Sequence, residues 1–358
     1  MTLTTTKKIL VIYTGGTFGM SENLEIPNLS GSQLKRRLEA NVPEMKRIAH
    51  CDVRILFNMD SCQMGLRHWL KMGRLIQDHA AHFDGVVILH GTDTLPYSAA
   101  ALSLLLTPSP IPVVLTGAQK PLSALRNDAR TNFITALEVA AGAPKKLQNR
   151  VMVAFHDEVF LGSRIRKLSA LDFSAFDSPR FPALARVGSS IQYHAADLPL
   201  PKQRKKMWPS IPEIRDSDQK TGASILKLEV TPEFSGDLFS TSFFEGLDGV
   251  LLTLFTSGTA PTENPSFIRF LERAKSTHTP IFAITEREDA PIQLSSYPAG
   301  KTMLSHGVLW CRDLTPEAAF VKAQLLHSQQ RTLNQQSKPG YLKWLRQNWQ
   351  RAISDETG

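Results

Sequence analysis

The chain has 358 residues, of which 42% are hydrophobic and 21% are charged, and it carries a net charge of +8. This composition is ordinary for a globular protein, and the length suits two domains of roughly 100–200 residues each. There are three cysteines, with no CxxC pair and no histidine–cysteine cluster at zinc spacing. We therefore expect a reducing compartment and no structural metal.

Short apolar segments alternate with helix-like segments in the first half of the chain. The apolar segments predict strands at Ile9–Tyr13, Val53–Phe57, Val86–Leu89, Val113–Thr116 and Val151–Phe155. Helical patterns lie between them at Ser32–Ala40, Leu66–His82, Tyr97–Leu106 and Ala129–Ala141, the last with Asp128 as its expected cap. This order predicts a mostly parallel sheet with helices on both faces. The first apolar segment is too short for a signal peptide and no segment is long enough to span a bilayer, so we expect a cytoplasmic protein without a membrane partner.

A basic, proline-rich stretch separates this half from the next. It contains the run PKQRKK at residues 201–206, but no nucleic-acid recognition motif accompanies the charge, so we interpret it as a solvated linker and expect no nucleic-acid partner. Beyond it we expect strands and helices at Ala223–Val230, Val250–Phe255, Phe267–Lys275, Ile281–Thr285 and Pro316–Gln329. The predicted fold class is α/β with two domains: a larger N-terminal domain over residues 1–195, a linker over 196–220 and a smaller C-terminal domain over 221–358.

The last segment, Tyr341–Ile353, predicts a helix with an aromatic stripe. One broad face of that helix would carry Tyr341, Trp344, Leu345, Trp349 and Ala352, with Asn348 among them. A stripe at this spacing indicates a docking face, either against the body of the protein or against a second subunit.

Polar loops follow four of the predicted strands. They read Thr14-Gly15-Gly16-Thr17, Asp60-Ser61-Cys62, His90-Gly91-Thr92-Asp93-Thr94 and Thr116-Gly117-Ala118-Gln119. Each loop alone also fits a tight turn or a helix cap. In a parallel sheet, however, all four reach the same edge, where this fold class binds its ligands. Small hydroxyl residues beside glycine suit a site that brings backbone N–H groups close to a small polar ligand.

The residues in these loops favour hydrolysis without a cofactor. The dinucleotide motif GxGxxG, the phosphate loop GxxxxGK[ST] and the serine-hydrolase elbow GxSxG are all absent. A threonine becomes a nucleophile only when a base takes its proton. Asp93 could orient a lysine for that purpose, and the segment 161–171 offers Lys167, although physical reasoning alone does not place Lys167 nearer the site than Arg164 or Arg166. The arginines are excluded as bases, because a guanidinium group stays protonated.

These motifs resemble the bacterial-type L-asparaginase family, and its cytoplasmic type I branch above all. The resemblance rests on YTGGTFGM at 13–20, NMDSCQM at 58–64, VVILHGTDTLPYSAAALS at 86–103 and VVLTGAQKPL at 113–122, with a fainter match at 161–179. It implies a two-domain α/β enzyme, active as a homodimer or homotetramer, that hydrolyses the small-molecule amide asparagine to aspartate and ammonia.

The resemblance also implies roles for individual residues. Thr17 would be the nucleophile that forms the acyl-enzyme. Thr92, Asp93 and Lys167 would form a second catalytic cluster, in which Asp93 also holds the substrate's α-amino group. The amino-acid head group would be bound by Asp60 and Ser61, the leaving amide would lie near Ala118, and backbone N–H groups, those of Thr17 and Thr92 among them, would form the oxyanion hole.

Three features depart from the family pattern. The loop at 21–30, expected to act as a lid, has no tyrosine, and Glu25 stands about where the family's lid tyrosine is expected. The family's Gly-Val-Gly-Asn loop in the smaller domain is replaced by residues 257–261, SGTAP. Leu254 and Arg287 lie near the positions of the arginine and cysteine that hold an effector asparagine in some type I enzymes, so we expect no such allosteric site.

Three alternatives remain open at this stage. The chain could be the amidase subunit of a tRNA-dependent transamidation complex, but such subunits carry an additional N-terminal domain, and the first motif here begins at Thr14. It could be a catalytically weakened relative that binds aspartate or asparagine as a sensor. It could also be a thiol hydrolase using Cys62, although cysteines in such places are more often small packing residues.

Overall fold

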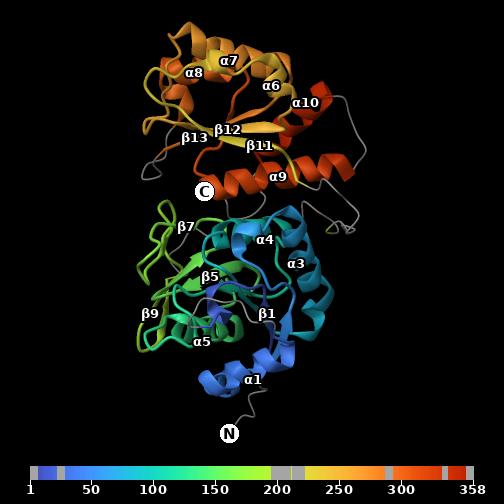
Figure 1. The fold of residues 1–358 in the computed structure, drawn as a ribbon, viewed down its shortest axis with the longest axis vertical. Helices are drawn as coiled ribbons and strands as arrows, with labels where there is room; N and C mark the ends of the chain where they lie inside the picture. Colours follow the sequence, from blue (N-terminus) through green and yellow to red (C-terminus); the bar gives the residue numbers. More distant parts are fainter. Residues whose placement is uncertain are drawn as a thin grey trace. The chain divides into compact units, whose positions relative to one another are not determined.

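The computed structural model describes residues 7–21, 29–194, 211, 222–286, 293–332 and 338–351. They form two compact units, one up to residue 211 and one from residue 222 onward (Figure 1). No helix in the described ranges is long and apolar enough to cross a membrane.

The N-terminal unit is built on an eight-stranded sheet with the order β10-β9-β6-β5-β4-β3-β1-β2. Five neighbouring strands are parallel, namely β2 (His50–Ile55), β1 (Lys8–Tyr13), β3 (Gly85–Leu89), β4 (Val113–Thr116) and β5 (Val151–Phe155). Three antiparallel strands complete the sheet: β6 (Glu158–Leu161), β9 (Ala185–Val187) and β10 (Ile191–Tyr193). The parallel strands are Val-, Ile- and Leu-rich because both of their faces are covered.

Helices cover both faces of this sheet, as Figure 1 shows for α5 on one side and α3 and α4 on the other. Side chains from α1 (Gly31–Asn41), α2 (Met45–Ile48) and α5 (Ala129–Gly142) share one core with Val11, Val87 and other strand residues. The other helices are α3 (Leu66–His79) and α4 (Leu95–Leu105). Helix α4 is buried on almost every side, which explains its uniformly apolar sequence.

The C-terminal unit contains a four-stranded parallel sheet with the order β11-β12-β13-β14. Its strands are β11 (Ile225–Glu229), β12 (Gly249–Leu254), β13 (Ile281–Thr285) and β14 (Leu309–Trp310). Its helices are α6 (Thr241–Glu245), α7 (Pro265–Ser276), α8 (Pro298–Ser305), α9 (Pro316–Thr332) and α10 (Lys338–Trp349). The predicted α/β fold class with two domains is therefore confirmed.

The aromatic stripe of α10 docks within its own unit. Tyr341, Leu345 and Trp349 are buried. The Trp349 ring lies 4.3 Å from that of Phe282, centroid to centroid, and its indole N–H donates to the carbonyl of Trp310 at 3.2 Å. The face that the sequence predicts to be a docking face therefore packs against the C-terminal unit itself. Ala352 and Ile353, which were expected at the end of this segment, lie outside the described residues.

Candidate active site

The loops that follow β1, β2 and β3 touch one another through glycine. A Cβ atom on Gly16, whose φ is +84°, would lie 2.4 Å from the Cα of Gly91. A Cβ atom on Gly91 would in turn lie 2.7 Å from the Cβ of Ser61. The fourth loop adjoins them, because a Cβ on Gly117 would lie 2.4 Å from the carbonyl oxygen of His90. Glycine is required where backbones approach this closely, and it brings the four polar loops together at one sheet edge.

A cluster of four polar side chains lies at this edge. The Lys167 ammonium group donates to Thr92 Oγ1 at 2.8 Å and to Asp93 Oδ1 at 2.7 Å. The Thr92 hydroxyl donates to Gln119 Oε1 at 3.3 Å. The Lys167 side chain is 16% exposed and that of Asp93 is 69% exposed, so the lysine is largely enclosed while the carboxylate faces solvent. An ion pair with one partner exposed to solvent adds little to the free energy of unfolding. A role in function therefore explains this pair better than a contribution to stability does.

A short hairpin carries Lys167 to the cluster. Strand β7 (Arg166–Lys167) pairs with β8 (Phe176–Asp177), which places Lys167 opposite Phe176. Among the basic residues that the sequence offered here, Lys167 is the one that hydrogen-bonds Thr92. Arg164 points elsewhere: it is 1% exposed and its guanidinium carbon lies 5.6 Å above the ring of Phe181.

Gln119 is a site residue to which the sequence assigned no role. Its amide nitrogen donates to the carbonyls of Ser169 and Asp172 at 3.4 and 3.2 Å, which leaves its oxygen directed at Thr92. Asp128 holds the same loop, since its carboxylate accepts the backbone N–H of Gln119 at 2.9 Å. Asp128 is the N-cap residue of α5, as expected from the sequence, but its side chain makes no cap hydrogen bond and holds this loop instead.

Thr17 begins a short 3₁₀ turn directly after Gly16. Phe18 anchors the turn, being 1% exposed and in edge-to-face contact with Phe133. Arg37 of α1 fastens the following residues by donating to the carbonyls of Gly19 and Met20, each at 3.0 Å. Within the described part of the chain the Thr17 hydroxyl has no hydrogen-bond partner. The lid candidate Glu25 lies outside the described residues.

The remaining expected binding residues also lie in the four loops. Asp60 is exposed, and its Oδ1 accepts the backbone N–H of Cys62 at 2.9 Å. Ser61 is 3% exposed, and its carbonyl accepts the hydroxyl of Thr94 at 2.7 Å. Ala118 is 1% exposed, so it offers the site a backbone and a methyl group. The structure thus joins the second and third loops by a hydrogen bond as well as by the glycine contact.

The thiol of Cys62 is exposed, but its environment does not activate it. Hydrogen bonding to the Asp60 carboxylate is the largest of the effects that raise its pKa. A nucleophilic cysteine needs the opposite shift, since the thiolate is the reactive form. The geometry therefore gives the thiol-hydrolase alternative no support.

Two of the positions that depart from the family pattern are described in the C-terminal unit. Leu254 ends β12 inside the hydrophobic core and is 1% exposed. The loop at 257–261 turns at Gly258, whose φ is +73° and whose N–H donates to the carbonyl of Phe255 at 2.8 Å. Arg287 lies outside the described residues.

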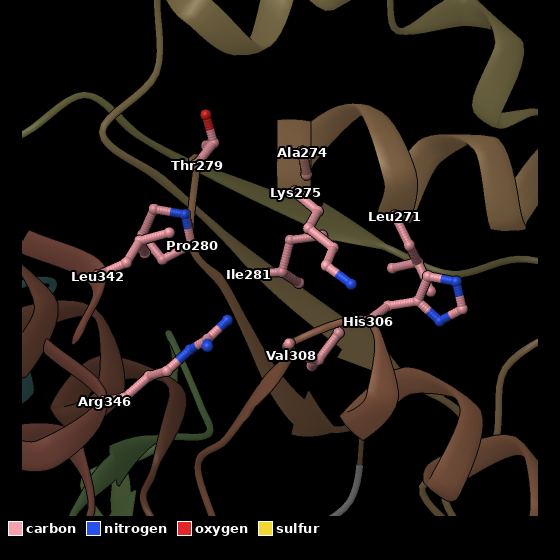
Figure 2. Close-up of a pocket in the computed structure, with 11 residues that line it drawn as sticks. Leu271, Ala274, Lys275, Thr279, Pro280, Ile281, His306, Val308, Leu342 and Arg346 are labelled. Carbon is pink, nitrogen blue, oxygen red and sulfur yellow. The ribbon is translucent and has the colours of Figure 1, made fainter. Parts of the chain in front are cut away.

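A pocket lies in the C-terminal unit, and all of its lining residues belong to that unit. It holds about 300 Å³ of empty space, part of it open to solvent, above an apolar floor that includes Ile281 and Val308. Figure 2 shows Lys275 and Arg346 extending toward it from different elements. Lys275 lies in the last turn of α7, where its positive charge interacts favourably with the carbonyl groups at the C-terminal end of the helix. Arg346 lies against Gly307, so both cations have structural explanations.

The residues that the structure describes contain no group of three histidine, cysteine, aspartate or glutamate side chains that could hold a metal ion.

Two family models and several known proteins match the chain over most of its length. Residues 8–198 match the family described as Asparaginase, N-terminal, and residues 225–338 match the Glutaminase/Asparaginase C-terminal domain. The chain is 33% identical to L-asparaginase 1 of Escherichia coli (strain K12) over 330 residues, which cover 90% of this chain and 93% of that protein. It is 28% identical to a glutamyl-tRNA(Gln) amidotransferase component of Pyrococcus abyssi, with 88% of this chain and 70% of that protein covered. Its fold matches the crystal structure of L-asparaginase I from Vibrio cholerae with a TM-score of 0.82 at 28% identity, covering 99% of this chain and 100% of that one.

Proposed function

The chain belongs to the asparaginase family, and we propose that it hydrolyses L-asparagine to L-aspartate and ammonia through an acyl-enzyme on Thr17. The observation that carries the proposal is the Lys167 ammonium group bonded to both Thr92 and Asp93, beside loops that meet at Gly16 and Gly91. It supports the proposal because a hydroxyl, a lysine and a carboxylate in one hydrogen-bonded row form a hydrolytic set comparable in role to a serine triad.

In the proposed reaction the Thr17 hydroxyl oxygen attacks the side-chain amide carbon of asparagine. The hydroxyl proton leaves with the amide nitrogen as ammonia, and an ester forms between Thr17 and the substrate's β-carbonyl. Water then attacks the ester, so that aspartate is released and the threonine hydroxyl is restored. Backbone N–H groups of Thr17 and Thr92 stabilise the oxyanion in both halves, a contribution that is typically the largest single one in such reactions.

The second cluster supplies the base for proton transfer. In the structure Thr92 accepts from Lys167 and donates to Gln119, whose amide oxygen cannot take up the proton. Proton relay therefore requires Lys167 to be neutral and the Thr92 O–H to turn toward Nζ. Asp93 orients the lysine and, being exposed, has room to receive the substrate's α-amino group. Asp60 and Ser61 bind the head group, and the leaving amide lies near Ala118.

The proposal extends to the protein's setting. We expect it to work in the cytoplasm without a cofactor, as a homodimer or homotetramer, with its N-terminal domain ending near residue 195 and its C-terminal domain starting near residue 221. Analytical ultracentrifugation at several concentrations tests the assembly, and a monomer at all of them would refute it.

The experiment that tests the function is ammonia release by the purified protein from a panel of amides. We expect release from asparagine, with stoichiometric aspartate. Absence of release from every free amide would refute the proposal. Binding of aspartate without turnover would then favour a sensor, and release only in the presence of charged tRNA and partner proteins would favour a role in transamidation.

A further inference from the structure

A chain of three buried hydrogen bonds runs behind the third motif loop. The indole N–H of Trp69 donates to Ser98 Oγ at 3.0 Å, and Ser98 Oγ lies 2.8 Å from His90 Nε2. His90 Nδ1 lies 2.7 Å from the carbonyl oxygen of Gly91. His90 and Ser98 are fully buried, so water does not compete for these contacts.

The proton positions in this chain follow from the donors and acceptors. A carbonyl oxygen can only accept, so His90 Nδ1 carries the proton that it donates to Gly91. Burial lowers the pKa of His90 to about 4, so the ring is neutral near pH 7 and its Nε2 is an acceptor. Ser98 then donates to Nε2 and accepts from Trp69. Each hydrogen bond in the chain therefore has only one possible donor and one possible acceptor. This fixes the histidine ring in a single tautomer and a single orientation.

This arrangement determines which way the next peptide points. The Gly91–Thr92 peptide is planar, so its C=O and N–H groups point in opposite directions. The carbonyl is turned inward to His90, and the Thr92 N–H is therefore turned away from the buried ring. Within the described ranges no acceptor hydrogen-bonds the Thr92 N–H, although Thr92 is 7% exposed. A backbone donor of a nearly buried residue, with no partner among the described residues, is suited to a ligand oxygen.

We propose that His90 is a positioning residue, which holds the Gly91 carbonyl so that the Thr92 N–H faces the oxyanion formed during amide hydrolysis. The inference rests on the proposed function for its catalytic meaning, but the peptide orientation can be tested without turnover. His90 acts through the Gly91–Thr92 peptide and touches neither substrate nor the Lys167 cluster. Because the oxyanion bears its full charge only near the transition state, misdirecting this donor lowers kcat more than it raises KM.

Two substitutions of His90 separate its two hydrogen bonds. In His90→Asn the side-chain amide nitrogen takes the place of Nδ1 and can still donate to Gly91. In His90→Gln the amide reaches the place of Nε2 and meets Ser98 but leaves the Gly91 carbonyl without a donor. Ser98→Ala is the matched control, since it breaks the same buried chain and leaves the contact with Gly91 in place.

We expect His90→Gln to lower kcat for asparagine by about 10- to 100-fold with KM within about three-fold. His90→Asn should recover most of that loss, and Ser98→Ala should stay within about two-fold of the wild type while losing thermal stability. An equal loss of kcat in Ser98→Ala and His90→Gln would overturn the inference, because the buried chain would then act only through stability.

Crystal structures of the wild type and His90→Gln supply the readout that does not depend on activity. We expect the Gly91–Thr92 peptide to rotate in the variant, so that its carbonyl no longer points at position 90. An unchanged peptide would overturn the inference whatever the kinetics show. If the wild type releases no ammonia, the proposed function fails, and a rotated peptide would still establish His90 as the residue that orients Thr92.

Discussion

Lys167 reaches Thr92 across 75 positions of sequence and donates to its hydroxyl oxygen at 2.8 Å. The lysine is on a two-stranded hairpin and the threonine is at the end of a central parallel strand, so the sheet and the hairpin must both form before the pair exists. The same ammonium group is bonded to Asp93, which fixes its direction. Because the pair joins the base and the hydroxyl of the proposed relay, replacing either residue tests the proposed chemistry.

Replacing Lys167 tests whether it acts as a base. If a neutral lysine accepts the proton, Lys167→Arg should be nearly as damaging as Lys167→Met, since arginine keeps the charge but cannot accept a proton. We expect both to lower kcat by ~10²–10⁴. Lys46→Arg is the control, because Lys46 also pairs with a carboxylate, that of Glu39, outside the site. Substantial activity in Lys167→Arg would mean that the lysine serves only as an electrostatic anchor.

Removing either threonine hydroxyl should abolish turnover with little effect on folding. Thr17→Ala and Thr92→Val remove the proposed nucleophile and relay, and each should lose ~10²–10⁴ in kcat while thermal unfolding stays close to the wild type. Thr279→Val is the control: it deletes a buried hydroxyl of the C-terminal unit that donates to the carbonyl of Phe244 at 2.9 Å, so it should cost stability and spare kcat. Either site variant keeping more than about a tenth of wild-type kcat, well short of the loss that acid–base assistance implies, would refute its assignment.

His90 should make the protein less stable in mild acid. The unfolded chain takes up a proton near pH 6.5, whereas the native state resists protonation down to about pH 4. The free energy of unfolding therefore falls as the pH drops from 6.5 toward 4, by up to roughly 3 kcal/mol, and this effect is absent above pH 6.5.

Urea unfolding of the wild type and His90→Asn across this pH range measures the effect. Burial also lowers the pKa of His68, but that contribution is common to both proteins and cancels in the comparison. The variant should show the flatter profile. Parallel profiles would show that His90 titrates normally in the native state.

The lid prediction for Glu25 stays open because the residue lies outside the described ranges. A carboxylate approaching a substrate that already carries one would weaken binding. On that reading Glu25→Gln should lower KM for asparagine above neutral pH, and Glu25→Tyr should raise kcat. Superimposable pH–rate profiles for the wild type and both variants would end the claim that Glu25 takes part.

Chelation should leave activity unchanged, since the proposed reaction uses only side chains and backbone N–H groups. Dialysis against EDTA, followed by kinetics with and without added divalent ions, tests this. Inhibition that a divalent ion reverses would contradict the proposed chemistry.

The central strands were predictable because all of their residues are buried, which requires a continuous apolar sequence. Val113–Thr116, Val151–Phe155 and Ile281–Thr285 are observed with the bounds expected from their apolar runs. Val53–Phe57 was misplaced: β2 runs from His50 to Ile55, since an edge strand is buried less uniformly and its pattern is weaker. The hairpin β7–β8 has two residues per strand, too few to show any periodicity.

The site was predictable as a set of loops, and the family resemblance also grouped Lys167 with Thr92 and Asp93, but other contacts were not predictable. The loop motifs placed Thr17, Thr92 and Asp93 after the ends of predicted strands. Arg164 and Arg166 were excluded as bases because a guanidinium group stays protonated. The directed contacts of His90 and Gln119 could not be inferred, because they depend on which ring nitrogen or amide atom faces which carbonyl. Sequence spacing carries no information about that choice.

The most direct test of the proposed mechanism is to trap the acyl-enzyme with hydroxylamine during asparagine turnover. Hydroxylamine competes with water for an ester on Thr17, so the wild type should form aspartate β-hydroxamate in addition to aspartate, with ammonia released for both. Thr17→Ala should form neither product. Release of aspartate and ammonia without any hydroxamate, or hydroxamate formed by Thr17→Ala at the wild-type rate, would contradict a threonine acyl-enzyme at this position.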